Sequence, residues 1–167
     1  MFDKTIFCPF LNVTMVLNGQ LIHHFLLGQI PEEANANGIC FSVLRKNVYF
    51  TQKKFNIITG LWPTNVTLMK DYDNKRLQSL PFGSENKKII TCLEVEEIFK
   101  IFEFTNDHDA MKVGLTVFIE TVMVRKDKKT QFDMDIFGRA DDDEVFKNFN
   151  WSTFFYTRLL NNLKTIL

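Results

Sequence analysis

Three cysteines and three histidines are the residues that could support covalent chemistry in this sequence. A thiol nucleophile needs a histidine within hydrogen-bonding reach and a carboxylate or amide that orients that histidine. By residue type alone, Cys92, His108 and Asp109 would allow such a centre. No local nucleophile signature surrounds any cysteine, however, and Cys40 lies in an apolar segment that is typical of a small core residue. The sequence therefore predicts no catalytic residue and a protein that is not an enzyme.

Metal-ion chemistry has equally little support in the spacing of the candidate ligands. His23 and His24 are adjacent, so on a helix they would point about 100° apart, and His108 is distant in the sequence. A zinc site needs three or four ligands at characteristic spacings. The acidic run at residues 141–144 could attract Mg²⁺, but consecutive acids usually mark a solvated helix start. No metal, no cofactor and no small-molecule substrate is predicted.

Two basic clusters are the candidates for contact with a protein partner or with a nucleic acid. In the first, basic side chains flank Tyr49 and Phe50, a pattern that can contact a phosphate backbone and stack bases. The second follows a long apolar helix and resembles a weak nuclear-localisation patch. The candidate residues are Arg45, Lys46, Lys53, Lys54, Arg125, Lys128 and Lys129. The chain has 20 basic and 20 acidic residues, and this balance favours solvated turns over nucleic-acid binding.

The densest aromatic group surrounds Trp151 and includes Phe149, Phe154, Phe155 and Tyr156. A single helix cannot bury all of these side chains on one stripe, so some must face another element or a partner. Core packing is the simpler interpretation, because large apolar residues usually lie inside. An exposed aromatic patch would instead indicate an interface.

The elements that must position these residues belong to an ordinary globular protein, with 46% hydrophobic residues, 24% charged residues and 18 Phe. Three widely separated cysteines do not form a disulfide framework, which favours an intracellular protein. No signal peptide and no apolar run of ~18 residues is present, so no membrane contact is expected. The basic patches make the nucleus the candidate compartment.

The apolar pattern predicts strands at 39–44 and 48–50 joined by a turn at 45–47, followed by a short helix that Thr51 caps and Gly60 closes. Further helices are expected at about 21–26, 93–104, 109–124 and from a cap at Ser152 to the C-terminus. Residues 64–88 look like an irregular insertion, and 132–136 fit either a strand or a helical turn. The predicted fold class is α+β, predominantly helical, a single domain over 1–167 with a small β-hairpin packed on a helical core.

Four motifs occur in order along the chain: Phe50 with Phe55 and the run Thr59, Gly60 and Leu61; the apolar helix at 109–124; the charged loop with Arg125, Lys128 and Lys129; and a closing aromatic group with Phe146, Trp151 and Phe155. They resemble the motifs of a plant domain of unknown function, the domain 1985 family. This domain is found ahead of ubiquitin-like (SUMO-type) cysteine proteases in transposon-derived proteins. The similar region covers about 19–164, and departures occur at Lys54, at the Trp62-Pro63 pair and at Ser152.

The resemblance implies an accessory, protein-interaction domain without an active site, associated with such proteases. The family has no established catalytic residues to transfer. Two alternatives stay open: a nucleic-acid-binding module of a transposon-derived protein, and a fragment of a SUMO-type cysteine protease that lacks its catalytic domain. The identity of a protein partner does not follow from the sequence.

Overall fold

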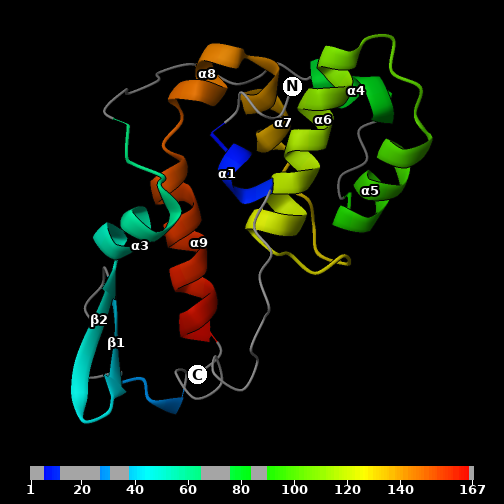
Figure 1. Ribbon diagram of the computed structural model, residues 1–167. Helices are drawn as coiled ribbons and strands as arrows, with labels where there is room; N and C mark the ends of the chain where they lie inside the picture. The colour runs from blue at the N-terminus through cyan, green and yellow to red at the C-terminus, as the bar shows by residue number, and fades with distance from the viewer. Residues whose placement is uncertain (1–5, 12–26, 31–37, 65–75, 84–89, 166–167) are drawn as a thin grey trace. The chain divides into compact units, whose positions relative to one another are not determined.

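A computed structural model describes residues 6–11, 27–30, 38–64, 76–83 and 90–165 (Figure 1). The chain divides into two compact units. Unit 1 comprises residues 1–5 and 65–149, and unit 2 comprises residues 6–64 and 150–167. The fold is α+β and predominantly helical, with an antiparallel β-hairpin, as the sequence predicts. The helix predicted at 21–26, together with His23 and His24, lies outside the described residues.

Unit 2 contains the hairpin and the helices that pack on it. Its elements are α1 (Cys8–Leu11), β1 (Gly38–Val43), β2 (Lys46–Thr51), α3 (Gln52–Thr59) and α9 (Trp151–Thr165). The predicted hairpin is confirmed, but its turn is shorter than the predicted 45–47. Leu44 and Arg45 form a two-residue turn with φ of 50° and 64°, the positive angles of a type I′ turn. Lys46 already pairs with Val43 and therefore belongs to the strand.

The predicted short helix after the hairpin is confirmed as α3. Gly60 ends it with a φ of 72°, a left-handed conformation that a glycine adopts without steric cost. Thr51 occupies the N-cap position, although its side chain makes no capping hydrogen bond. Phe55 and Asn56 are the buried residues of α3, and they hold the helix against α9.

The core of unit 2 is aromatic. Trp151 stacks on Phe155 with 5.6 Å between ring centroids, and Phe7 meets the Trp151 ring edge-on at 5.4 Å. The prediction that Ser152 caps α9 is wrong. The Oδ1 atom of Asn150 accepts a hydrogen bond from the Thr153 N–H at 3.0 Å, so Asn150 caps the helix instead. Ser152 is fully buried one residue inside the helix.

Unit 1 is built from helices around one apolar cluster. Its elements are α4 (Arg76–Phe82), α5 (Cys92–Ile101), α6 (Asp107–Phe118), the π-helical segment η3 (Ile119–Met123), α7 (Asp135–Asp141) and α8 (Asp143–Asn148). Leu77, Val95, Val113 and Phe137 are central members of the cluster. The 64–88 segment is therefore not irregular throughout. Residues 76–82 are helical, and Leu77 buries that helix in the core.

The two predicted helices at 93–104 and 109–124 are confirmed with shifted ends. α5 begins at a capping box in which the Thr91 side chain accepts from the Glu94 N–H, and it ends at Ile101, so Phe102 is extended. α6 begins after Asn106, whose Oδ1 accepts from the Asp109 N–H at 2.7 Å. The 132–136 segment adopts the helical alternative only from residue 135, where α7 begins.

Candidate interaction surface

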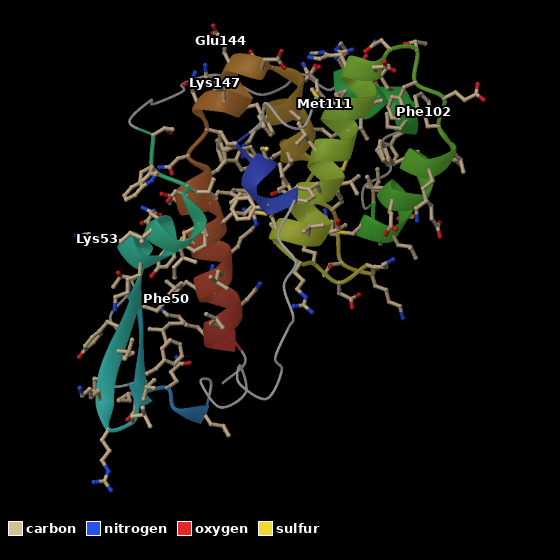
Figure 2. All side chains as sticks on the ribbon, viewed as in Figure 1. Phe50, Lys53, Phe102, Met111, Glu144 and Lys147 are labelled. Carbon is tan, nitrogen blue, oxygen red and sulfur yellow. The ribbon has the colours of Figure 1, made fainter. Side chains whose placement is uncertain are left out.

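The solvent side of α3 combines lysines with aliphatic side chains. Since Phe55 and Asn56 face inward, the positions that remain outward are those of Lys53, Lys54 and the two isoleucines. Each lysine lies four residues before an isoleucine, so the two pairs are neighbours along the helix. Ile57 is 61% exposed and Ile58 is 75% exposed. Figure 2 shows Lys53 on the side of α3 that is turned away from α9.

Trp62 lies two residues after Gly60, which ends α3, and its side chain is 60% exposed. We call Lys53, Lys54, Ile57, Ile58 and Trp62 the α3 face. The exposure of its apolar members was not predicted from the sequence, which indicated only that Ile58 and Phe55 belong to the same helix. Three of four consecutive residues, 55–58, are apolar, so periodicity alone could not show which of them faces inward.

The first predicted basic cluster is spread along the hairpin rather than gathered in one place. Arg45 and Lys46 lie at its tip, and Lys53 and Lys54 follow its base. A six-residue strand spans ~20 Å, so β2 separates the two pairs by about that length. Within the described residues, none of the four has a carboxylate partner; Lys54 Nζ donates to the carbonyl of Tyr49.

The aromatic residues of this cluster have different surroundings. The half-buried Phe50 ring packs against Tyr156 with 6.1 Å between centroids, so less of it is available for stacking on a base. Tyr49 is 44% exposed. Leu44, an aliphatic residue at the hairpin tip, is 93% exposed to solvent.

The overall balance of charge hides a division between the units. Unit 2 has six Lys and Arg residues against two Glu residues, a net charge of +4. Unit 1 has fourteen against eighteen acidic residues, a net charge of −4. The neutral total therefore conceals a positively charged unit, which could attract an anionic partner.

The second predicted basic cluster, in unit 1, is partly neutralised. Lys128 Nζ lies 3.2 Å from the Glu96 carboxylate, and Lys128 together with Lys100 lowers the pKa of Glu96. Arg125 and Lys129 are exposed, and the Lys129 N–H donates to Asp127. This cluster is thus less able than the hairpin to attract an anionic partner.

A buried ion pair lies next to that cluster. Glu120, in the π-helical segment, is fully buried and contacts the ammonium group of Lys126. Its Oε2 also accepts from the Asp133 N–H at 3.2 Å, and Lys126 Nζ donates to the Gln131 carbonyl at 3.2 Å. A shallow hollow of about 380 Å³ adjoins the pair, lined by Lys126, Gln131, Phe132, Asp133, Met134 and Asp135. The ion pair therefore holds Lys126, which follows η3, against Glu120 within η3.

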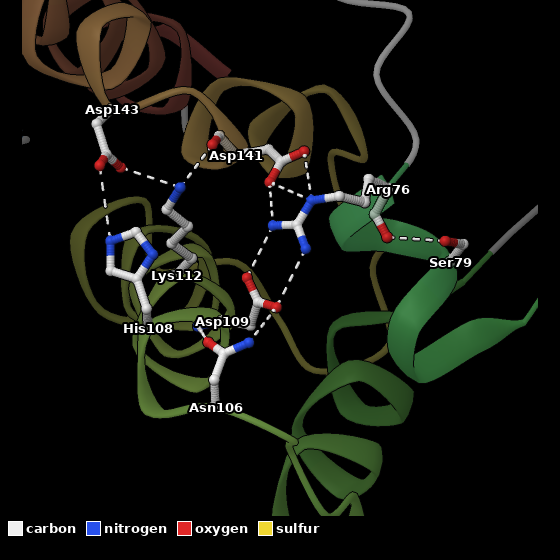
Figure 3. A network of polar contacts seen from close by, with 8 residues as sticks. All are labelled: Arg76, Ser79, Asn106, His108, Asp109, Lys112, Asp141 and Asp143. Carbon is white, nitrogen blue, oxygen red and sulfur yellow. Dashed lines mark hydrogen bonds and ion pairs between the residues drawn. The ribbon is translucent and has the colours of Figure 1, made fainter.

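Arg76 is the centre of a second ion network in unit 1 (Figure 3). Its guanidinium donates to both Asp109 oxygens, at 2.7 and 3.1 Å, and its Nε donates to Asp141 at 3.0 Å. This bidentate contact holds the pKa of Asp109 at about 2, below its ordinary 3.8, and raises the pKa of Arg76. Lys112 is buried and lies 3.0 Å from Asp143.

The network accounts for the residues that could have supported chemistry. Asp109 pairs with Arg76, and His108 lies 3.6 Å from Asp143 rather than beside a thiol. Members of the 141–144 acidic run bind cations or cap α8, so the run is not merely solvated. Within the part of the chain that the structure describes, no three His, Cys, Asp or Glu residues gather as metal ligands.

The thiol groups are in surroundings that disfavour a nucleophile. Cys92 is 1% exposed, and burial raises its pKa, with the charge of Glu120 adding to the effect. Cys40 is fully buried in β1. Cys8 is half-buried at the start of α1, and none of the three cysteines forms a disulfide. A raised pKa leaves less of the reactive thiolate at neutral pH.

The aromatic group around Trp151 is mainly core. Trp151, Phe155 and Tyr156 are all at least nine-tenths buried. Arg158 lies over the Phe154 ring at 3.6 Å, and in unit 1 Arg139 lies over the Phe149 ring at 4.7 Å. The simpler interpretation, core packing, holds for the buried members.

The remaining motif residues have structural surroundings. Phe55 and Leu61 are buried in unit 2, and the Thr59 hydroxyl donates to the Phe55 carbonyl at 2.8 Å. Gly60 ends α3, and Phe146 packs against the apolar cluster of unit 1. The motifs therefore mark the fold, whereas the exposed surface is formed by residues beside them.

Comparison with known proteins matches the chain to a protein family. A family model described as Domain of unknown function (DUF1985) matches residues 26–162. Neither a curated protein nor a solved structure matches the chain. Among the described residues, no helix is long and apolar enough to cross a membrane.

Proposed function

Because the chain belongs to the DUF1985 family, a domain of unknown function, we propose that it is a non-catalytic protein-interaction module. The observation that carries the proposal is the α3 face, where Ile57, Ile58 and Trp62 are each at least 60% exposed within a stretch of six residues. Exposed apolar side chains that cluster in this way are typical of interaction sites, whereas scattered ones are ordinary.

The surroundings of the thiols and histidine support the non-catalytic part of the proposal. Burial raises the pKa of Cys92, and Asp109 binds Arg76 instead of orienting a histidine. A cysteine protease requires the opposite, a thiolate beside an oriented imidazole. We therefore favour an accessory role over a residual protease, which Cys92→Ala would reveal by abolishing cleavage of SUMO-linked substrates.

The resemblance of the motifs to the plant family suggests the setting. We propose that the module belongs to a transposon-derived protein associated with ubiquitin-like proteases, and that it acts inside the cell, in the nucleus. Under this proposal, the α3 face supplies contacts for the parent protein rather than chemistry. Fluorescence microscopy of the tagged chain would test the location.

Site-specific photo-crosslinking tests the interaction role. A photo-reactive amino acid at position 58 should give crosslinked species in an extract of the source cells, and excess unlabelled chain should suppress them. The same group at Ile101, which is 79% exposed on α5 of unit 1, is the matched control. Equal crosslinking from both positions, or none from position 58, would refute the proposal.

A second candidate function, nucleic-acid binding, is favoured by the +4 charge of unit 2. Under this alternative, Arg45, Lys46, Lys53 and Lys54 contact the phosphate backbone. Binding should then weaken steeply with salt and disappear when the four residues are changed to Glu. Absence of wild-type retention on single-stranded DNA or RNA at low salt would end this candidate.

A further inference from the structure

We infer that the α3 face binds an acidic segment of a partner protein, one that also carries apolar side chains. This inference rests on the proposed interaction function and specifies the chemistry of the partner. The apolar part of the face is the pair Ile57 and Ile58 with Trp62 beyond them, and the cationic part is Lys53 and Lys54. An acidic segment with apolar residues matches both parts at once.

The positions of the two lysines are unfavourable for α3 itself. Lys53 and Lys54 lie in the first turn, where the helix dipole favours acidic side chains and disfavours cations. In unit 1, α5, α6, α7 and α8 each carry an acidic residue in the first turn. Exposed residues that lower the stability of their own helix, as these lysines do, are expected where the residues serve binding.

Nothing described in unit 2 neutralises this charge. The two acidic residues of unit 2, Glu32 and Glu33, lie outside the described residues, and within them Lys53 and Lys54 have no carboxylate within ion-pair distance. Arg45 and Lys46 continue the positive charge to the hairpin tip, ~20 Å away along β2. A bound acidic segment could follow this line of charge.

The apolar side chains favour a protein over a nucleic acid as the occupant. Single-stranded nucleic acids stack their bases on aromatic rings, and Trp62 is the one aromatic member of the α3 face, while Phe50 packs against Tyr156. The most exposed apolar residues of α3 are aliphatic, and aliphatic side chains are complementary to the apolar residues of a peptide. The charge alone would suit either class, so the aliphatic residues decide between them.

Selection of random peptides on the full chain tests the inference. A phage-displayed library of random 16-residue peptides should yield sequences rich in Asp and Glu with interspersed Leu, Ile or Phe. Fluorescence anisotropy would then compare one selected peptide with two synthetic versions, one with its acids changed to amides and one with its apolar residues changed to Ser. An oligothymidine of 20 nucleotides is the nucleic-acid probe.

Paired variants locate the binding surface. Lys53→Glu with Lys54→Glu, and Ile57→Ser with Ile58→Ser, should each weaken binding of the selected peptide by about tenfold or more. Lys147→Glu and Ile101→Ser, at exposed positions of unit 1, should leave it unchanged. Circular dichroism of every variant would verify that unit 2 remains folded.

The remaining outcomes separate the two levels of the proposal. Selection of neutral or basic peptides that need Ile57 and Ile58 would overturn the acidic partner and keep the interaction module. No selection dependent on the α3 face would overturn both. If only the oligothymidine binds, the inferred partner is replaced by a nucleic acid. If the chain self-associates in sedimentation and the isoleucine variant does not, the partner is a second copy of the chain.

Discussion

In unit 1, Arg76 and Lys126 contact carboxylates that are themselves largely buried, and the buried Lys112 contacts the exposed carboxylate of Asp143. In unit 2, the hairpin and α3 present four cations without a described carboxylate partner, beside aliphatic side chains that water surrounds. Lys and Arg residues thus form ion pairs within unit 1, whereas in unit 2 they lie on the exposed surface. The comparison shows that charge matters here by its placement, since the total is zero.

The largest difference between the units is expected at the buried pair. Lys126→Ala would leave the Glu120 carboxylate buried without its cation, which should lower the free energy of unfolding by about 3 kcal/mol. Lys53→Ala in unit 2 should change it by no more than about 0.5 kcal/mol. Urea denaturation followed by circular dichroism measures both. Equal effects of the two substitutions would break the comparison.

The Arg76 network should give a smaller effect. Arg76→Ala removes charge-assisted hydrogen bonds to Asp109 and Asp141 and should cost about 2 kcal/mol. Its side chain is 48% exposed, so water can reach part of the vacated space and limit the loss. Arg76→Lys keeps the charge but not the bidentate geometry and should recover only part of the stability.

The pH dependence of that loss follows from Asp109. Its pKa in the folded state, about 2, lies below the ordinary 3.8, so the contribution of the pair is complete above about pH 4 and declines as the pH falls toward 2. The stability gap between the wild type and Arg76→Ala should therefore narrow over this range. Urea titrations at pH 5 and pH 2.5 test this, and a gap that widens in acid would contradict the assigned pairing.

The hairpin turn offers an effect of the opposite sign. Arg45 has a φ of 64°, a conformation that costs a side chain energy and costs glycine little. Arg45→Gly should stabilise the protein by about 1 kcal/mol, in keeping with the glycine preference of type I′ turns. Thermal unfolding would show it as a higher Tm. A lower Tm would mean that the Arg45 side chain stabilises unit 2 through contacts.

The smallest predicted change sharpens the comparison at the α3 face. Lys53→Glu with Lys54→Glu replaces cations by anions at the start of α3, where the dipole favours anions. The free energy of unfolding should rise by about 0.5 kcal/mol at low salt and return toward the wild-type value at high salt. Loss of stability would show that the lysines support the fold.

Much of the fold could be predicted because local signals coincide with the observed ends of elements. Gly60 stops α3, and Asn106 caps α6 in the way their residue types indicate. The helix α4 was not foreseen, because Pro81 and Gly83 suggest a break, yet the helix includes Pro81 and ends only at Phe82. Ser152 looks like a cap by type, and only the tertiary structure shows that it is buried and that Asn150 caps.

The candidate surface was less predictable than the fold. The lysines could be identified from their spacing with aromatics, but the exposure of Ile58 depends on which side of α3 meets α9. The division of charge was hidden because unit 2 is assembled from residues 6–64 and 150–167, with unit 1 inserted between them. The net charge of the whole sequence is the sum over both units, and no local sequence pattern marks the boundary between them.

This interrupted arrangement has a consequence for the order in which the protein forms on the ribosome. The aromatic residues of α9 that Phe7 needs are synthesised about 140 residues after it, when all of unit 1 has already left the peptidyl-transferase centre. A premature stop codon just before Trp151 would therefore leave the residues of unit 1 complete and remove α9, against which Phe7 and α3 pack in unit 2.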